Sequence, residues 1–196
     1  GFETGLDLPK SGRLLFFYDM KTQPWGFDPA HAGSARVFHI DGDVVGQSDA
    51  PWPMSPVPMT PVQFRQIRTV PNSWSLWIDD LRPSAVERSD LDDLLTWRYH
   101  SGAQIGGHPD VLQGAGMEVE SELASSGHYR GGTDPVPYPD AVMTRLAKQW
   151  RLLLQLPSDD ALGTMWGDNG MIYFWIRETD LAKRDFSRVW LILQCF

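Results

Sequence analysis

Short apolar runs bounded by turn-forming residues are the dominant pattern along this 196-residue chain. Runs of four to eight aliphatic or aromatic residues between Gly, Pro, Asn and Asp are typical of β-strands, and so is a strict alternation of apolar and polar residues. On these two criteria the sequence predicts strands at residues 13–19, 36–40, 62–70, 116–127, 151–156, 171–176 and 188–196.

Helical spacing is found in three other places. Residues 89–100 begin with Ser89, a favourable N-cap, and carry acids in their first turns. Residues 139–150 place Val142, Leu146 and Trp150 on one helical face, and "ETDLAKRDF" is a short helical connection between the last two strands.

Residues 46–61 contain five prolines, which exclude a helix interior and indicate an extended surface linker.

Two stretches of the chain are similar to each other in sequence. "SGRLLFFYD" leads to "GSARVFHI" much as "NGMIYFWI" leads to "DFSRVWLIL": each has a small-residue turn, an aromatic strand, a connection and a strand opening with Arg-Val-aromatic. We therefore expect an α+β fold, a single domain over 1–196 with two related antiparallel sheet units at roughly 1–70 and 104–196. Chance similarity of two aromatic strands is the alternative. The second unit has an extra leading strand, so either a segment precedes Gly1 or the first unit is a degraded repeat.

Composition and charge narrow the classes of function. Hydrophobic residues make up 42% and charged residues 21%, as in an ordinary folded soluble domain. The net charge is −8 and no cluster of Lys or Arg occurs, which argues against nucleic acid as a partner. No apolar run approaches the roughly 20 residues that span a bilayer. The single cysteine, Cys195, excludes a disulfide within the chain and fits a cytoplasmic location.

Four longer motifs resemble a known family. They are "GRLLFFYDMKTQPWGFDPAHAGSARV", "QIGGHPDVLQGAGMEVESEL", "WRLLLQLPSDDALGTMWGDNGMIYFWI" and "DLAKRDFSRVWLILQCF". Together they resemble the YwqG-like bacterial family, a domain of unknown function. The resemblance implies a mixed α+β fold with duplicated antiparallel sheets and a further segment before the first aromatic strand. It implies no catalytic residues, although relatives are suggested to be immunity proteins against polymorphic toxins.

The loop "QIGGHPDVLQG", residues 104–114, is the first candidate site. Gly106 and Gly107 permit positive φ or close backbone approach, so that His108, Asp110 and Gln113 can present polar groups to a ligand or a partner's backbone. The glycine spacing matches neither a Walker loop nor a dinucleotide fingerprint. The alternative is a turn whose His and Asp bind only its own amides.

The second candidate is an acidic strip. If residues 116–127 form a strand, then Glu118, Glu120 and Glu122 share one face because side chains alternate with a period of two. Such a strip suits a basic protein partner, for example a toxin that cuts nucleic acid. A solvated outer sheet face is the alternative.

The third candidate is a pair of Trp-Gly loops. Trp25 in "PWGFDP" and Trp166 in "MWGDNG" are each followed by glycine, and Asp168 and Asn169 follow Trp166. We expect the two loops to form the walls of a shared pocket between the half-domains.

The sequence gives no clear catalytic or metal set. Histidines lack the short paired spacing of zinc sites, and the acids of residues 159–169 do not follow an EF-hand loop. No metal or cofactor is therefore predicted, the catalytic residues are unknown and the oligomeric state is open. The leading hypothesis is a non-enzymatic protein- or ligand-binding module. The alternatives are an immunity protein and a hydrolase or metal-dependent enzyme that uses His108, Asp110 and Asp168.

Overall fold

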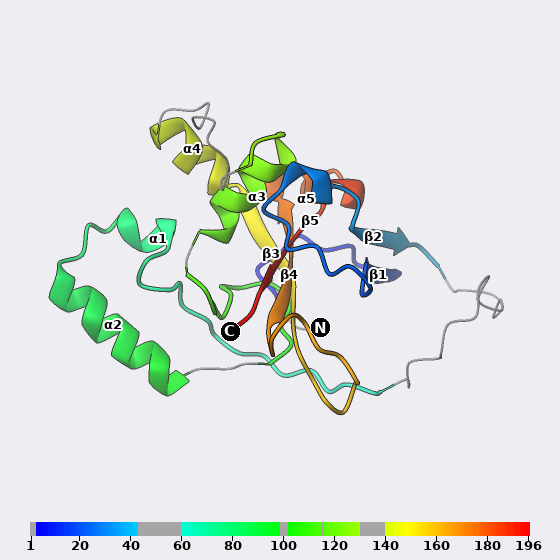
Figure 1. Cartoon of the computed structure of the whole chain (residues 1–196), viewed down its shortest axis with the longest axis horizontal. Helices are drawn as coiled ribbons and strands as arrows, with labels where there is room; N and C mark the ends of the chain where they lie inside the picture. Colours follow the sequence, from blue (N-terminus) through cyan, green and yellow to red (C-terminus); the bar gives the residue numbers. More distant parts are fainter. Residues whose placement is uncertain (1–2, 43–59, 99–101, 115, 130–139) are drawn as a thin grey trace.

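The protein has an α+β architecture (Figure 1). The computed structural model describes residues 3–42, 60–98, 102–114, 116–129 and 140–196. In these ranges the elements are, in chain order, β1 (Arg13–Tyr18), the 3₁₀ helix η1 (Pro29–His31), β2 (Ala35–Ile40), α1 (Leu76–Asp79), α2 (Ala85–Arg98), α3 (Met117–Ser125), α4 (Asp140–Ala147), β3 (Trp150–Pro157), β4 (Met171–Arg177), α5 (Glu178–Ala182), the 3₁₀ helix η2 (Phe186–Arg188) and β5 (Trp190–Gln194).

A three-stranded antiparallel sheet in the order β3-β4-β5 forms the centre of the molecule. Six of the seven residues of β4 are buried, because this middle strand is covered on both faces. The pairing of β3 with β4 shifts by one residue between Leu152 and Leu154, which is a β-bulge.

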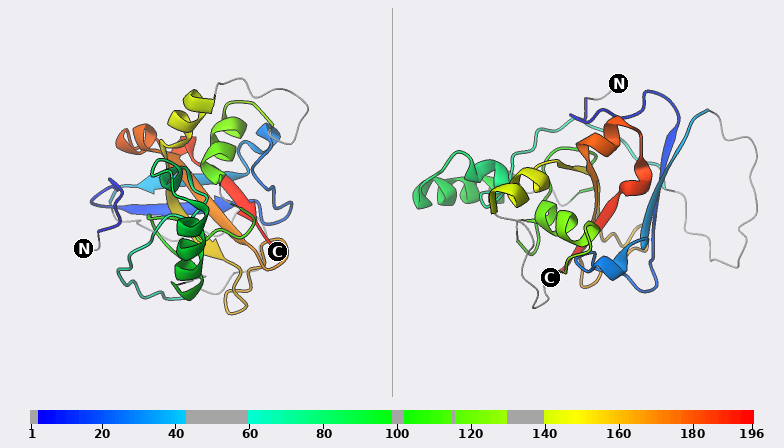
Figure 2. Two further views of the ribbon diagram at one scale, coloured as in Figure 1. Left: turned by 90° about the vertical axis from the view of Figure 1, so that its left-hand side faces the viewer. Right: turned by 90° about the horizontal axis from the view of Figure 1, so that it is seen from above.

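One face of this sheet packs against the β1-β2 hairpin. Phe174 on β4 meets Phe16 on β1 edge to face, with ring centroids 5.1 Å apart. Val37 on β2 is 3% exposed and belongs to the same core. The right-hand view of Figure 2 shows the blue hairpin on one side of the sheet and the green and yellow helices α3 and α4 on the other.

The opposite face of the sheet packs against α3 and residues 111–112. Trp150 donates its indole N–H to Glu122 Oε2 at 2.9 Å, and Arg177 Nη2 donates to the same oxygen at 2.9 Å. Glu122 is only 4% exposed, so the α3 interface contains a buried carboxylate whose charge is paired with the guanidinium of Arg177, which is 17% exposed.

The strands predicted at 13–19, 36–40, 151–156, 171–176 and 188–196 are confirmed, apart from small shifts in their ends. Two of the predicted helices are confirmed with different bounds. The helix expected from Ser89 begins at Ala85, because Ser84 and Glu87 form a capping box: Ser84 N donates to Glu87 Oε2 at 2.8 Å. The helix expected over 139–150 ends at Ala147, and Trp150 begins β3. The short helical connection after β4 is α5 with η2.

Two strand predictions are wrong. Residues 62–70 have no regular secondary structure and are mostly exposed. Residues 117–125 form the helix α3, which buries Glu118, Ser121 and Glu122 at spacings of three and four residues. Because these three polar residues make up half of the six that α3 buries, the hydrophobic pattern does not reveal the helix.

Residues 46–59 of the predicted proline-rich linker lie outside the described residues. The pairs β1-β2 and β4-β5 are both antiparallel, and their common origin stays a prediction. In the described part of the chain, no helix is both long and apolar enough to cross a membrane.

Candidate functional site

The loop 102–114 is held from beneath by the side chain of Gln155. This residue lies on β3 with 0% of its surface exposed. Its Oε1 accepts from the amide of Asp110 at 2.9 Å, and its Nε2 donates to Asp110 Oδ2 at 2.9 Å and to Gly102 O at 3.0 Å. The single buried amide of Gln155 therefore fixes the loop at two points, Gly102 and Asp110.

Two other residues of the sheet also form hydrogen bonds to the backbone of this loop. Tyr173 on β4 lies opposite Gln155 in the sheet register and donates its hydroxyl to Asp110 O at 2.5 Å. Gln194 on β5 accepts at Oε1 from the amides of Leu112 and Gln113, at 2.9 and 3.1 Å. The loop is thus bound to side chains from all three strands.

The side chain of Gln104 forms hydrogen bonds within the loop itself. Gln104 pairs with Gln155 through two backbone hydrogen bonds, and its Nε2 donates to Gly106 O at 2.7 Å and to His108 O at 2.9 Å. Gly106 and Gly107 have φ of 68° and 73°. A Cβ on Gly106 would lie 2.4 Å from Thr4 O, so a close backbone approach requires the glycine.

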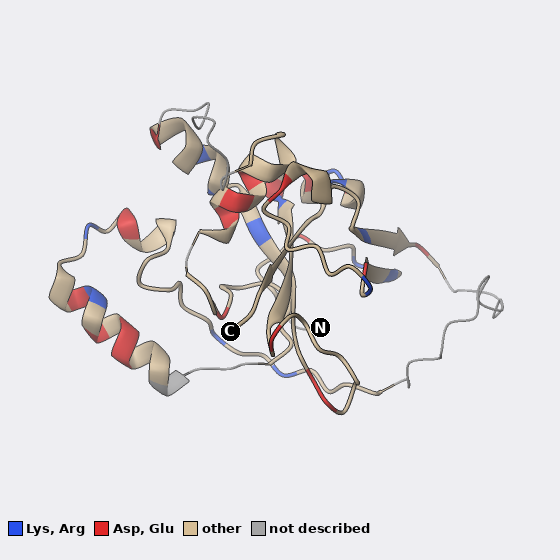
Figure 3. Cartoon of the chain, in the orientation of Figure 1, with Lys and Arg blue, Asp and Glu red and all other residues tan. Residues whose placement is uncertain are grey.

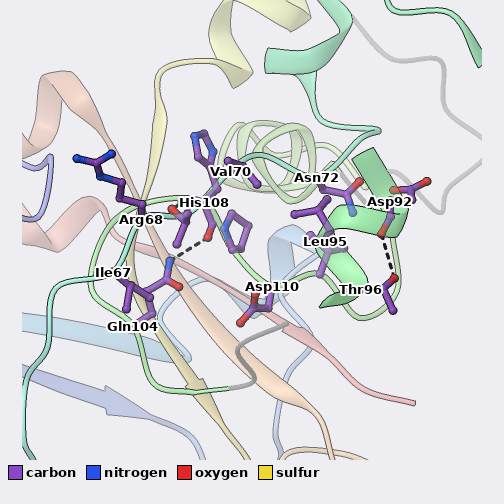
Figure 4. Close-up of a pocket in the computed structure, with 13 residues that line it drawn as sticks. Ile67, Arg68, Val70, Asn72, Asp92, Leu95, Thr96, Gln104, His108 and Asp110 are labelled. Atoms are coloured by element: carbon purple, nitrogen blue, oxygen red, sulfur yellow. Dashed lines mark hydrogen bonds between the residues drawn. The ribbon is translucent and has the colours of Figure 1, made fainter. Parts of the chain in front are cut away.

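A cavity of about 550 Å³ lies outside this loop (Figure 4). Its three walls are the loop, the segment 67–72 and α2. The lining residues are Ile67, Arg68, Thr69, Val70, Asn72, Asp92, Leu95, Thr96, Gln104, His108, Pro109, Asp110 and Val111. The volume is in the range of small-molecule sites, and the lining combines aliphatic side chains with a few polar groups.

Hydrogen bonds connect the walls of the cavity to their surroundings. The amide of His108 donates to Thr69 Oγ1 at 2.9 Å, which joins the loop to segment 67–72. Asp92 on α2 accepts a hydrogen bond from the buried Ser73, and Thr96 Oγ1 donates to Asp92 O at 2.9 Å. The His108–Thr69 contact joins the loop to segment 67–72, and the Ser73–Asp92 contact joins α2 to the residue that directly follows that segment.

The imidazole of His108 is half-buried in this cavity. Burial lowers its pKa below the ordinary value, and the positive charge of Arg151 lowers the pKa further. Neutral imidazole therefore predominates at pH 7, with one nitrogen as donor and the other as acceptor. Figure 4 shows the guanidinium of Arg68 pointing away from Asp92 and Asp110.

The predicted acidic strip is not formed. Glu118 and Glu122 are 7% and 4% exposed on the inner side of α3, and Glu120 is half-buried. Burial raises the pKa of Glu118, with a further increase from the charge of Glu120. These glutamates cannot present a row of carboxylates to a partner because two of the three face the protein interior.

The two Trp-Gly loops do lie side by side. Gln23 joins them: its Oε1 accepts from Gly167 N at 2.8 Å and its Nε2 donates to Met165 O at 2.9 Å. Trp166 is 3% exposed in the core, and Trp25 packs against Phe27. Neither tryptophan lines the cavity, so the shared pocket expected between them differs from the one observed.

Asp168 and Asn169 occupy the exposed turn before β4. The carbonyl of Asp168 accepts from Phe196 N at 3.1 Å, and Asn169 has a left-handed φ of 51°. Both are absent from the lining of the cavity, whereas His108 and Asp110 are part of it. Gln113 is exposed beyond the lining, where its amide binds Gln194. Among the described residues, no group of three or more His, Cys, Asp or Glu is placed to hold a metal ion.

Sequence reasoning missed Gln155, Gln194 and the walls formed by α2 and 67–72. A signal for the glutamines does exist. "RLLLQLP" and "WLILQCF" each contain one amide within an apolar strand, and a polar group in such a position requires a hydrogen-bond partner.

Almost the whole chain matches the model of one protein family. The model of the family described as "Domain of unknown function (DUF1963)" matches residues 2–195. The chain belongs to the DUF1963 family. No curated protein gives a significant match to this DUF1963 domain. The finer resemblance to YwqG-like proteins stays a prediction.

Proposed function

We propose that this DUF1963 domain is a non-enzymatic binding module whose ligand occupies the cavity between loop 104–111, segment 67–72 and α2. One observation carries the proposal: the loop that forms one wall is fixed by buried Gln155 and Gln104, while His108 and Asp110 face a space of about 550 Å³. A preformed wall lowers the entropy cost of binding.

The chemistry of the lining supports a ligand with an aliphatic body and a cationic end. Val70, Leu95 and Val111 offer apolar contacts. Two aspartates and one arginine line the cavity, and neutral His108 adds no charge at pH 7. A basic side chain of a protein partner has this chemistry, and so does a small amine.

The enzyme alternative expects His108, Asp110 or Asp168 in one cleft within hydrogen-bond reach of each other, as a His/Asp site across the two loops. Asp168 is exposed in the turn before β4 and does not line the cavity that contains the other two. The His/Asp pair across the two loops therefore has no support from the geometry, and binding is the function that we propose.

An NMR screen tests this proposal. A set of cationic, neutral and anionic small molecules and short basic peptides is titrated into the protein, and the expected ligands shift the amide signals of residues 67–72 and 104–111. Val70→Trp fills the cavity and should abolish these shifts. Val62→Trp adds the same ring outside the cavity, five residues before segment 67–72 and at a residue that is 67% exposed, and should leave these shifts unchanged.

Substitution of a lining acid tests the charge preference. Asp92→Asn should weaken cationic ligands by about tenfold, since a charged hydrogen-bond partner becomes neutral. Asp93→Asn is the matched control, because Asp93 is an exposed acid of α2 that does not line the cavity. Ligands that shift only the signals of residues 165–170 would overturn the proposed site.

A further inference from the structure

The outer face of the β1-β2 hairpin is an exposed apolar surface. Side chains alternate along a strand, and Leu14, Phe16 and Tyr18 pack into the core. The register then places three cross-strand pairs on the opposite face: Arg13 with Ile40, Leu15 with Phe38, and Phe17 with Arg36. We call these six residues the hairpin face.

Two large aromatic rings of the hairpin face are accessible. Phe17 is 53% exposed and Phe38 is 52% exposed, and their rings meet edge to face with centroids 5.7 Å apart. Figure 2, right, shows every described helix and the three-stranded sheet on the other side of the hairpin. Within the described residues, nothing in the fold covers this pair of phenylalanines.

The arrangement of the six residues is self-complementary. Arg13 and Arg36 lie at opposite ends of the hairpin and on different strands, so they occupy one diagonal of the face. Phe17 and Ile40 occupy the other diagonal, and Leu15 and Phe38 form the centre. The pattern therefore has an approximate two-fold symmetry of its own.

This symmetry decides which residues meet when two copies stack face to face. A two-fold axis in the plane of the interface exchanges the two strands when it runs parallel to them, and exchanges the two ends of the hairpin when it runs perpendicular to them. Either operation places each arginine over an apolar residue of the second copy, and neither places arginine on arginine. A guanidinium over a phenylalanine ring is a favourable cation–π contact, and such isologous contacts are the usual basis of homodimers.

We propose that the hairpin face binds a second copy of this chain and forms a two-fold symmetric dimer. The face is small, since it consists of six side chains on two short strands. Interfaces below about 1,200 Å² in total are weak and transient, so the expected Kd is on the order of 10 µM to 1 mM. The dimer buries the two phenylalanines and leaves the cavity of the proposed function open, so the two proposals are independent.

Sedimentation velocity from about 5 to 500 µM protein tests the dimer over the range expected for a small interface. The weight-average sedimentation coefficient of the wild type should rise with concentration. The double variant Phe17→Ser with Phe38→Ser should weaken association by at least about tenfold. Because both residues are more than half exposed, its thermal unfolding should match that of the wild type.

Two control variants complete the experiment. Val62→Ser with Leu81→Ser removes exposed apolar side chains elsewhere and should dimerise as the wild type does. Arg13→Glu with Arg36→Glu places carboxylates over the aromatic rings and should also weaken association. The proposal is overturned if the wild type stays monomeric throughout, or if the Phe17/Phe38 double variant associates as strongly as the wild type.

Discussion

Gln155 and Asp110 are joined by two hydrogen bonds of 2.9 Å, one to the amide and one to the carboxylate of the aspartate. The amide group of Gln155 thus fixes the position of a loop that is 45 residues distant in sequence. Gln155 has no exposed surface, so its replacement by a smaller residue removes these bonds and leaves a cavity beside the sheet.

The first prediction concerns this glutamine. Gln155→Ala removes three hydrogen bonds and should lower the free energy of unfolding by roughly 2–4 kcal/mol, as measured by urea denaturation. Gln113→Ala, in the same loop, should change it by less than about 0.5 kcal/mol because this side chain is exposed. Equal effects of the two substitutions would show that Gln155 does not hold the loop.

The second prediction compares two glycine-to-alanine substitutions, to separate the cost of a left-handed backbone conformation from the cost of a steric clash. Gly106 and Gly163 both have positive φ, 68° and 63°. Alanine at either position costs about 1 kcal/mol for the left-handed conformation. At Gly106 the new Cβ would also meet Thr4 O at 2.4 Å, whereas at Gly163 nothing lies within 4 Å. Gly106→Ala should therefore cost roughly 1–3 kcal/mol more than Gly163→Ala in thermal or urea unfolding.

The third prediction uses the lowered pKa of His108. Burial and the charge of Arg151 disfavour the protonated imidazole in the folded state. The unfolded chain therefore binds the proton first as the pH falls below about 6.5, and folding stability decreases there. In His108→Gln this part of the pH dependence should disappear. Urea unfolding at several pH values from about 5 to 8 measures it, and identical slopes for both proteins would contradict the prediction.

Glu118 gives a prediction of opposite sign. Burial raises the pKa of its carboxyl group, so the folded state binds the proton more tightly than the unfolded state. Stability from this group is present at low pH and is lost as the pH rises above about 4.3. Glu118→Gln should therefore be more stable relative to wild type at pH 7 than at pH 4. A stability difference between Glu118→Gln and the wild type that is the same at both pH values would contradict the prediction.

The fifth prediction compares two ion pairs of the same chain. Glu122 is buried beside Arg177 and Trp150. Glu122→Ala leaves the buried indole N–H of Trp150 without its acceptor and removes one carboxylate from the Arg177 guanidinium, which is 17% exposed and keeps Ser125 and Asp180 as partners. The expected cost is roughly 2–4 kcal/mol. Glu178, 65% exposed, pairs with Arg151 at 2.8 Å, and Glu178→Ala should cost no more than about 1 kcal/mol. Urea denaturation of both variants measures the difference.

The five strands of the two sheets were predictable because their apolar runs are short, and four of the five contain or adjoin Gly, Pro, Asp or Asn at one end. Helix α3 was not, because its buried face carries Glu118, Ser121 and Glu122. Their cost of burial is offset in part by Trp150 and Arg177, which come from strands at least 25 residues later in the chain. The high helix propensity of Glu, Ala, Leu and Met in "MEVESELA" was the better signal.

For the candidate site, the sequence indicated the loop that forms one wall of the cavity and two residues that line it, His108 and Asp110. It did not predict the opposite walls, because Thr69 and Asp92 belong to segments with no motif of their own. The sequence grouped Asp168 with His108 and Asp110 only because its loop is likewise polar and contains glycine. Only the tertiary fold decides which polar loops face each other.

The cavity has one stiff wall and one compliant wall. Loop 104–114 is bound to three strands of the central sheet, so its amides should exchange with solvent as slowly as those of the sheet. Helix α2 projects from the body of the molecule (Figure 3), and Asp92 and Arg88 bind residues 73–79 rather than the sheet. A ligand that needs more room than the resting cavity offers would gain it by displacing α2, and its rate of entry would then report on the local unfolding of residues 72–98.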